Sequence, residues 1–367
     1  MRIGINLSEI FYETELVNNS LNIVKLLSQI AETKNLEVIV ITNNLSPADV
    51  INDIPKKNTT VVNIDKHSFL YKAYHKLLGN RMATDINALK LDILYPCINY
   101  EKWHKQLKCR VYYWMFDFQH RHMPNMFQVE EFERREANFF TIAEKAKDIV
   151  FSSHNAKEDF FKFYFETKGN LHVFQFVSLM QIPPKQANKA PYPTKYFIVC
   201  NQFWPHKNHE VVLKAMAFIK KAGANINVIF TGKYDYAPSK DYVEMLQNFI
   251  RNNHLKDQVF FTGFISRNEQ IQLIQNALAV IQPSLFEGWS TVIEDAKALD
   301  KFIVASDIAI NREQLKDNMV FFDPHNDLEL AKHLSELYTA DNLLCDSHYD
   351  RNIKQSKEDL IAIFNIQ

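Results

Sequence analysis

Short apolar segments alternate with longer amphipathic ones along the first half of the chain. The apolar segments are rich in β-branched residues, as strands are, whereas between residues 21 and 31 leucine, valine and isoleucine recur with the spacing of a buried helix face. The pattern predicts helical segments between strands over residues 2–7, 38–42, 60–64, 91–95, 111–115 and 149–152. Strands that alternate with helices form parallel sheets, so we expect a Rossmann-like domain over residues 1–180.

The same alternation returns after a segment that contains several prolines. Pro183, Pro184, Pro191 and Pro193 prevent a continuous helix, so residues 181–195 are predicted to be a linker. Strands are then predicted over residues 196–200, 228–232, 259–263, 277–281, 302–305 and 320–322, and helices over residues 211–219, 328–338 and 353–364. We expect a second Rossmann-like domain over residues 196–345 and a C-terminal helix within residues 346–367.

Composition narrows the class of protein. At 367 residues the chain is long enough for two domains that each bury a core. Its formal net charge of -1 provides little attraction to nucleic acid, so no nucleic-acid partner is expected. The four cysteines lack the spacing of paired or metal-binding cysteines, and no signal-peptide pattern or membrane-length apolar run occurs. These features predict a cytoplasmic protein without a membrane-spanning helix.

The most informative segment of the second half, residues 283–299, follows a predicted strand. Thr291 and Glu294 have the Ser/Thr-x-x-Glu spacing of a capping box, which predicts a helix start with Glu294 in its cap. Glu287 in the loop and Asp295 in the first turn would flank the backbone amides of that start. Such amides bind anions and carboxylates accept hydrogen bonds from hydroxyls, so the segment is predicted to bind a phosphate flanked by sugars. An ordinary strand-to-helix corner with an acidic first turn is the alternative.

This segment resembles the Glu-x7-Glu signature of family 4 of the retaining glycosyltransferases. The resemblance implies the α/β fold called GT-B, in which two Rossmann-like domains face each other across a cleft and a C-terminal helix crosses back to the first domain. It also implies that Glu287 contacts the donor hexose and that Asp295 contacts the ribose. The chain has Asp295 in place of the second glutamate, and a ribose contact through the preceding Glu294 is an alternative. The implied nucleotide-sugar contacts of the loop and helix start are Gly288, Trp289, Ser290, Thr291 and Val292.

Further segments of the second half resemble the same family. Gln202 and Lys207 have the spacing of an Arg-x4-Lys pair that binds the diphosphate. Because Gln202 can donate a hydrogen bond but supplies no charge, Lys207 is expected to carry more of the leaving-group stabilisation. Lys233 follows a strand as in relatives, and Gly263 and Phe264 occupy the region where relatives place the nucleotide base.

In the first half, the segment 114–124 resembles the Asp-Phe-Gln-His segment of a subset of these enzymes. The resemblance implies that Asp117 and His120 lie near the donor sugar and the acceptor, with His122 as an alternative. The cluster lacks further ligands at a metal-binding spacing, and the chain contains no Asp-x-Asp motif, the usual carboxylate pair for a divalent metal on a nucleotide diphosphate. We therefore predict that the reaction needs no metal and no cofactor.

A basic amphipathic helix is predicted over residues 66–81. It could rest on the inner face of the plasma membrane, where a lipid-linked acceptor resides, or cover the sheet as an ordinary packing helix. Core packing is the simpler interpretation, because packing against the sheet is enough to explain an apolar helix face.

These observations predict a retaining, metal-independent glycosyltransferase. It would move a hexose from a nucleotide-diphosphate sugar to a glycan, lipid-linked or protein-linked acceptor, in bacterial surface polysaccharide, lipopolysaccharide or glycoprotein assembly. One alternative is a non-catalytic sugar-nucleotide-binding partner protein, which Gln202 favours. A GT-B-fold nucleotide-sugar epimerase is disfavoured by Glu287, Asp295 and Lys207, and a dinucleotide-dependent dehydrogenase by the lack of a Gly-x-Gly-x-x-Gly motif.

Overall fold

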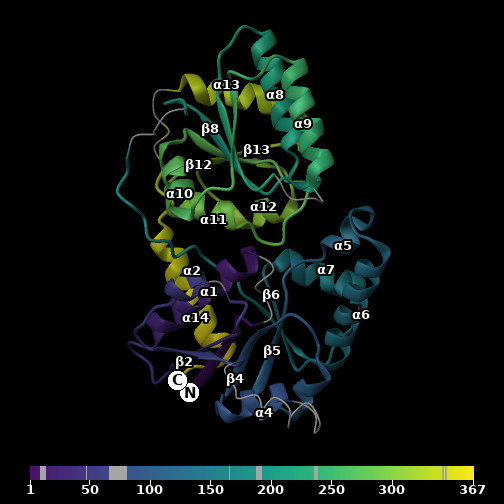
Figure 1. Cartoon of the computed structure of the whole chain (residues 1–367), viewed down its shortest axis with the longest axis vertical. Coiled ribbons are helices and arrows are strands. Elements are labelled where there is room, and N and C mark those ends of the chain that lie inside the picture. Colours follow the sequence, from purple (N-terminus) through teal and green to yellow (C-terminus); the bar gives the residue numbers. More distant parts are fainter. Residues whose placement is uncertain are drawn as a thin grey trace. The chain divides into compact units, whose positions relative to one another are not determined.

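The computed structural model describes residues 1–8, 14–46, 48–65, 81–164, 166–186, 192–234, 239–340, 343 and 345–367. The chain divides into two compact units, which are traced in Figure 1. Unit 1 comprises Met1–Leu179 together with Asp350–Gln367, and unit 2 comprises Met180–Tyr349. The last residues of the chain therefore fold with the first ones. The amphipathic segment predicted over residues 66–81 lies outside the described residues except for Arg81.

Unit 1 is built on a parallel sheet of seven strands in the order β3-β2-β1-β4-β5-β6-β7. The strands are β1 (Arg2–Asn6), β2 (Glu37–Thr42), β3 (Thr59–Asn63), β4 (Ile93–Cys97), β5 (Arg110–Met115), β6 (Asp148–Phe151) and β7 (Asn170–Val173). Strand β4 is buried along its whole length, as expected for an inner strand that helices cover on both faces. The edge strand β7 was not predicted, because it is only half-buried and two of its four residues, Asn170 and His172, are polar.

Helices accompany the strands of unit 1. They are α1 (Thr14–Ile30), α2 (Ala48–Asn52), α4 (Arg81–Ala88), η1 (Lys102–Gln106), α5 (Gln119–His122), η2 (Pro124–Met126), α6 (Val129–Lys145), α7 (His154–Tyr164) and α14 (Tyr349–Phe364). Helix α6 buries Phe139, Ile142 and Ala143, which have the spacing of a helix that covers a sheet. These side chains share an apolar core with Tyr113 and Phe151 of the strands.

Helix α14 anchors the end of the chain in unit 1. The ring of Phe364 lies 5.6 Å from that of Tyr95 and 5.1 Å from that of Tyr112, centroid to centroid. The Tyr112 hydroxyl donates a hydrogen bond to the carbonyl of Ile363 at 3.0 Å. Aromatic packing on β4 and β5 therefore fixes the last turn of the helix.

Unit 2 is built on a second parallel sheet, of six strands in the order β10-β9-β8-β11-β12-β13. The strands are β8 (Phe197–Cys200), β9 (Val228–Thr231), β10 (Val259–Gly263), β11 (Ala279–Gln282), β12 (Phe302–Ser306) and β13 (Met319–Phe322). Along β8, Phe197 and Val199 enter one apolar core, and Ile198 and Cys200 enter another. Successive strand residues point to opposite faces, so each face of this sheet has its own core.

Helices cover both faces of the second sheet. They are η3 (Pro205–Lys207), α8 (His209–Lys221), α9 (Lys240–Asn252), α10 (Arg267–Asn276), α11 (Thr291–Ala298), α12 (Ala309–Gln314) and α13 (Asp327–Thr339). Side chains of α8, α9 and α13 fill one core, and side chains of α10 and α11 fill the other. Two α/β units, each built on a sheet of parallel strands, confirm the predicted fold class. Within the described ranges, no helix is both long and apolar enough to cross a bilayer.

Candidate active site

Five of the predicted ligand-binding residues follow or end strands of unit 2. Gln202 and Lys207 follow β8, Lys233 follows β9, Gly263 ends β10 and Glu287 follows β11. In a parallel sheet these carboxyl ends share one edge, and doubly wound folds bind their ligands there. The second sheet therefore gathers these residues at one edge.

A buried ion pair joins two of these residues. The Lys207 Nζ donates to both carboxylate oxygens of Glu287, at 2.8 and 3.0 Å, and each residue is at most 7% exposed. Gln282 Nε2 donates to the same carboxylate at 2.7 Å. A buried ion pair contributes little net stability relative to apolar side chains, so its presence at this edge points to binding or chemistry.

Hydrogen bonds tie together the loops that carry this pair. The amide of Leu285 donates to the carbonyl of His206 at 2.7 Å, which joins the loop after β11 to η3. Asn208 adopts the left-handed conformation with φ 54°, and its Nδ2 donates to the carbonyl of Pro283 at 3.1 Å. Because both loops are fixed to one another, the ammonium and the carboxylate are held in place.

Two histidines next to Lys207 are neutral. Burial, with weaker repulsion from Lys207 and His209, lowers the pKa of His206 to about 3. Burial also lowers the pKa of His209 to about 3, and its ring stacks on Phe203 with centroids 4.5 Å apart. At neutral pH these imidazoles therefore add no positive charge beside the Lys207 ammonium.

Helix α11 begins with a different cap from the predicted one. Its N-cap is Ser290, whose hydroxyl accepts a hydrogen bond from the amide of Ile293 at 3.3 Å. The predicted capping box of Thr291 and Glu294 is wrong, because Thr291 is already the first helical residue. Ser290 caps the helix one position earlier.

Glu294 is bonded inside unit 2 rather than in the cap. Its Oε1 accepts hydrogen bonds from Lys297 Nζ at 2.8 Å and Gln314 Nε2 at 2.9 Å, and its Oε2 accepts one from the Tyr349 hydroxyl at 2.7 Å. Gln314 Oε1 in turn accepts a hydrogen bond from the amide of Ser290 at 3.0 Å. Three protein donors therefore already occupy the Glu294 carboxylate, which is 1% exposed.

Asp295 pairs with a cation that the sequence analysis missed. Arg267 Nη2 donates to Asp295 Oδ1 at 2.6 Å, and Asp295 is 3% exposed. Arg267 is the first residue of α10, whose start is stabilised by a capping box of Ser266 and Glu269. The Ser-x-x-Glu spacing just after a predicted strand is the signal that could have placed this helix start, and with it Arg267, at the ligand-binding edge.

Near Gln202, Lys233 and Gly263, the main chain at Gly232 passes close to the main chain at Asn201. Gln202 Oε1 accepts a hydrogen bond from the amide of Lys233 at 3.2 Å, and the amide of Gly232 donates to the carbonyl of Gly263 at 3.2 Å. A β-carbon on Gly232 would lie 2.2 Å from the carbonyl oxygen of Asn201. Only glycine fits there, because no carbon atom can lie so close to a main-chain oxygen.

Replacing Gly232 by alanine is expected to destabilise unit 2 by roughly 1–3 kcal/mol, because the overlapping main chain must move. Gly223→Ala is the matched control. Gly223 also has a positive φ, 82°, but no atom lies within 4 Å of its β-carbon position. Urea unfolding of both variants measures the difference, and equal losses of stability would show that the close approach is unimportant.

The other predicted residues of this edge differ in exposure. Val292 is buried in the apolar core, Gly288, Trp289 and Thr291 are partly exposed, and Phe264 is 75% exposed. Phe264 therefore presents an aromatic face at the carboxyl end of β10.

The predicted residues Asp117 and His120 lie in unit 1, after β5. His120 is fully buried, and its Nε2 lies 2.8 Å from Glu136 Oε1. Burial lowers the pKa of His120, although Glu136 partly opposes the effect. Asp117 Oδ1 accepts a hydrogen bond from the amide two residues later at 3.0 Å, and the alternative His122 lies 2.6 Å from Asp159 Oδ2. These contacts fix the segment locally, and a catalytic role for Asp117 or His120 stays a prediction.

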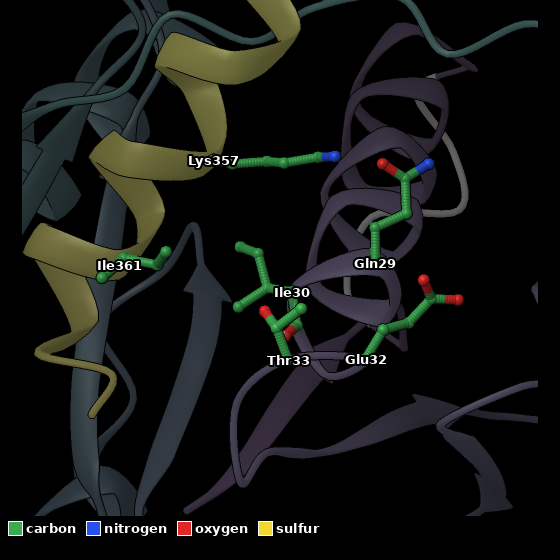
Figure 2. Close-up of a pocket in the computed structure, with 6 residues that line it drawn as sticks. All are labelled: Gln29, Ile30, Glu32, Thr33, Lys357 and Ile361. Carbon is green, nitrogen blue, oxygen red and sulfur yellow. The ribbon is translucent and has the colours of Figure 1, made fainter.

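A pocket of about 580 Å³ lies in unit 1 beside α1 and α14. Figure 2 shows Lys357 extending from α14 toward α1. The pocket is lined by Gln29, Ile30, Glu32, Thr33, Lys357 and Ile361. None of the predicted site residues lines it.

The described residues contain no group of three or more histidine, cysteine, aspartate or glutamate side chains placed to hold a metal ion. Metal-independent chemistry stays a prediction.

Solved structures share the architecture over nearly the whole chain. TarM matches with a TM-score of 0.71 at 12% identity, covering 99% of this chain and 98% of TarM. Anabaena HepE, in complex with UDP and glucose, matches with a TM-score of 0.68 at 16% identity, covering 100% of this chain and 97% of HepE. The fold is therefore that of the GT-B glycosyltransferases.

Sequence comparison finds a known family over the second half of the chain. Residues 183–358 match the family described as Glycosyl transferases group 1. The O-antigen chain mannosyltransferase RfbU of Salmonella typhimurium is 26% identical over 188 residues, which cover 50% of this chain and 48% of RfbU. The chain spans about half the length of the curated relatives it matches. The family match covers the whole carboxyl edge of the second sheet.

Proposed function

We propose that this protein moves a hexose from a nucleotide-diphosphate sugar to an acceptor hydroxyl, with retention of configuration and without a metal ion. The buried pair of Lys207 and Glu287 carries the proposal, because it places a cation and a carboxylate at the ligand-binding edge of a group 1 domain. HepE, which shares the fold, is complexed with UDP and glucose, and this supports a nucleotide-sugar donor. The name of RfbU supports a setting in bacterial surface glycan assembly, with a glycan or lipid-linked acceptor.

The two charges suit the two halves of the reaction. As the bond between the anomeric carbon and the phosphate oxygen breaks, its electron pair leaves with the diphosphate and positive charge develops on the sugar. In the proposed mechanism Lys207 stabilises the diphosphate and Glu287 stabilises the sugar. The acceptor oxygen bonds to the anomeric carbon on the face that the leaving group vacates, and its proton passes to the departing phosphate oxygen. No protein carboxylate needs to act as the nucleophile.

The nucleotide would lie along the start of α11. Amides in the first turn of a helix have no partner within the helix and bind phosphate, which suits Thr291 and Val292. We assign the ribose to Asp295, because three protein donors already occupy Glu294. Gln202, Lys233, Gly263 and Phe264 would complete the diphosphate and base contacts.

Calorimetry of the whole chain with UDP, GDP, CDP and dTDP and their common sugar conjugates tests this function. We expect one conjugate to bind selectively and to be turned over in the presence of EDTA. Strict dependence on added magnesium or manganese would contradict the metal-independent reaction. Selective binding without turnover would instead favour a non-catalytic sugar-nucleotide-binding protein, a candidate that the neutral Gln202 supports.

A further inference from the structure

We infer that Arg267 is a positioning residue for nucleotide recognition, which holds the Asp295 carboxylate oriented toward the ribose hydroxyls. The inference rests on the proposed function and extends it to a residue outside the Glu-x7-Glu and Arg-x4-Lys motifs. Its basis is the arrangement of hydrogen bonds, charge and exposure around Asp295.

The guanidinium of Arg267 is fixed at two points. Its Nη2 donates to Asp295 Oδ1 at 2.6 Å, and its Nη1 donates to Gln270 Oε1 at 2.7 Å. Gln270 Nε2 in turn lies 3.4 Å from Thr231 Oγ1. This chain of polar contacts runs from the end of β9 through the start of α10 to α11. A planar guanidinium held at two nitrogens can fix the plane of the carboxylate it binds, which a flexible ammonium does less well.

The cation that pairs with Asp295 is open to solvent, unlike the cations that pair with the two neighbouring acids. The Lys207 and Lys297 side chains that pair with Glu287 and Glu294 are 8% and 15% exposed, whereas the Arg267 side chain is 44% exposed. A ligand at the sheet edge can therefore approach the Asp295 pair without first displacing a buried cation.

The sheet topology places this pair at a switch point. Helix α11, which carries Asp295, follows β11, and β11 pairs with β8 at the point where the strand order reverses. Doubly wound folds bind nucleotides at such a point. Because aspartate is one methylene shorter than glutamate, its carboxylate reaches less far from α11, and fixing its orientation matters correspondingly more.

Binding of ribonucleotides and their deoxy analogues to the full chain tests the inference. Calorimetry would compare UDP, GDP, CDP and ADP with their 2′-deoxy and 3′-deoxy forms, and dTDP with its 3′-deoxy form. In the wild type, loss of a ribose hydroxyl is expected to weaken binding of the preferred nucleotide by about tenfold. In Arg267→Ala the parent nucleotide should bind about tenfold more weakly while its deoxy forms change little. The ratio of the dissociation constants of the deoxy and parent nucleotides should therefore approach one. Arg267→Lys, which keeps the charge but loses the planar fork, should give an intermediate ratio.

Arg251→Ala is the matched control, because Arg251 is an exposed arginine of α9 in the same unit, and it should leave the ratio unchanged. If Arg267→Ala and Arg267→Lys weaken the parent and deoxy forms equally, the inference is overturned while the proposed function stands. If the wild type binds none of the nucleoside diphosphates, the proposed function and the inference fail together. Thermal unfolding of each variant identifies a loss of folding, and the lysine variant supplies the ratio if the alanine variant is unstable.

Discussion

Replacing Glu287 by glutamine is expected to slow sugar transfer by on the order of 100-fold and to leave nucleoside diphosphate binding nearly unchanged. Glutamine keeps the shape of the side chain and an oxygen that can accept the hydrogen bond of Gln282 Nε2. It removes the negative charge that would oppose the positive charge of the sugar as the donor bond breaks. Initial rates at saturating donor, with calorimetric dissociation constants for the nucleoside diphosphate, separate the two effects.

Glu244→Gln provides the control for this experiment, because Glu244 is an exposed glutamate of α9 in the same unit and its replacement should leave the rate unaltered. Glutamine at position 287 leaves Lys207 without its charge partner, so the assay must be run well below the unfolding midpoint of the variant. Turnover near that of the wild type in the folded Glu287→Gln variant would show that the carboxylate has no part in the reaction.

The fold could be predicted where apolar residues form short runs, because buried parallel strands consist of little else. The alternation of strands and helices in both units follows from that pattern. Edge strand β7 could not be found in this way, since its residues are half-exposed and its sequence, Asn-Leu-His-Val, is as polar as a loop. The cap of α11 was misplaced by one residue because Ser290 and Thr291 are both good N-caps. The amide of Ser290 bonds to Gln314, which is distant in sequence. This contact is compatible with Ser290 as the N-cap but not with Thr291.

The sequence could suggest single candidate residues at the carboxyl edge of the second sheet but not how they pair. Lys207 and Glu287 were each expected to contact a different part of the donor, and no local pattern indicates that residues 80 positions apart bind one another. Arg267 was missed because the Ser-x-x-Glu spacing of Ser266 and Glu269 was not used to place a helix start, and a single arginine has no distinctive spacing of its own. Gln282 and Gln314 carry neutral amides, which become informative only when the fold places buried carboxylates next to them.

The pair of Lys207 and Glu287 should affect stability as well as chemistry. Replacing Lys207 by methionine is expected to destabilise unit 2 by about 3–5 kcal/mol, because the Glu287 carboxylate would remain buried without its cation. Transfer should also be lost, since no positive charge would then lie beside the leaving diphosphate at this position. Urea unfolding and the transfer assay measure the two losses separately.

The double variant Lys207→Met with Glu287→Gln distinguishes charge compensation from packing. It removes both charges but keeps an acceptor for Gln282, so its stability is expected to return most of the way to that of the wild type. Its transfer activity should stay as low as that of the single variants, because a neutral pair can stabilise neither the diphosphate nor the sugar. A double variant as unstable as Lys207→Met alone would mean that the lysine stabilises unit 2 through packing. Substantial transfer by a stable double variant would remove the pair from the mechanism.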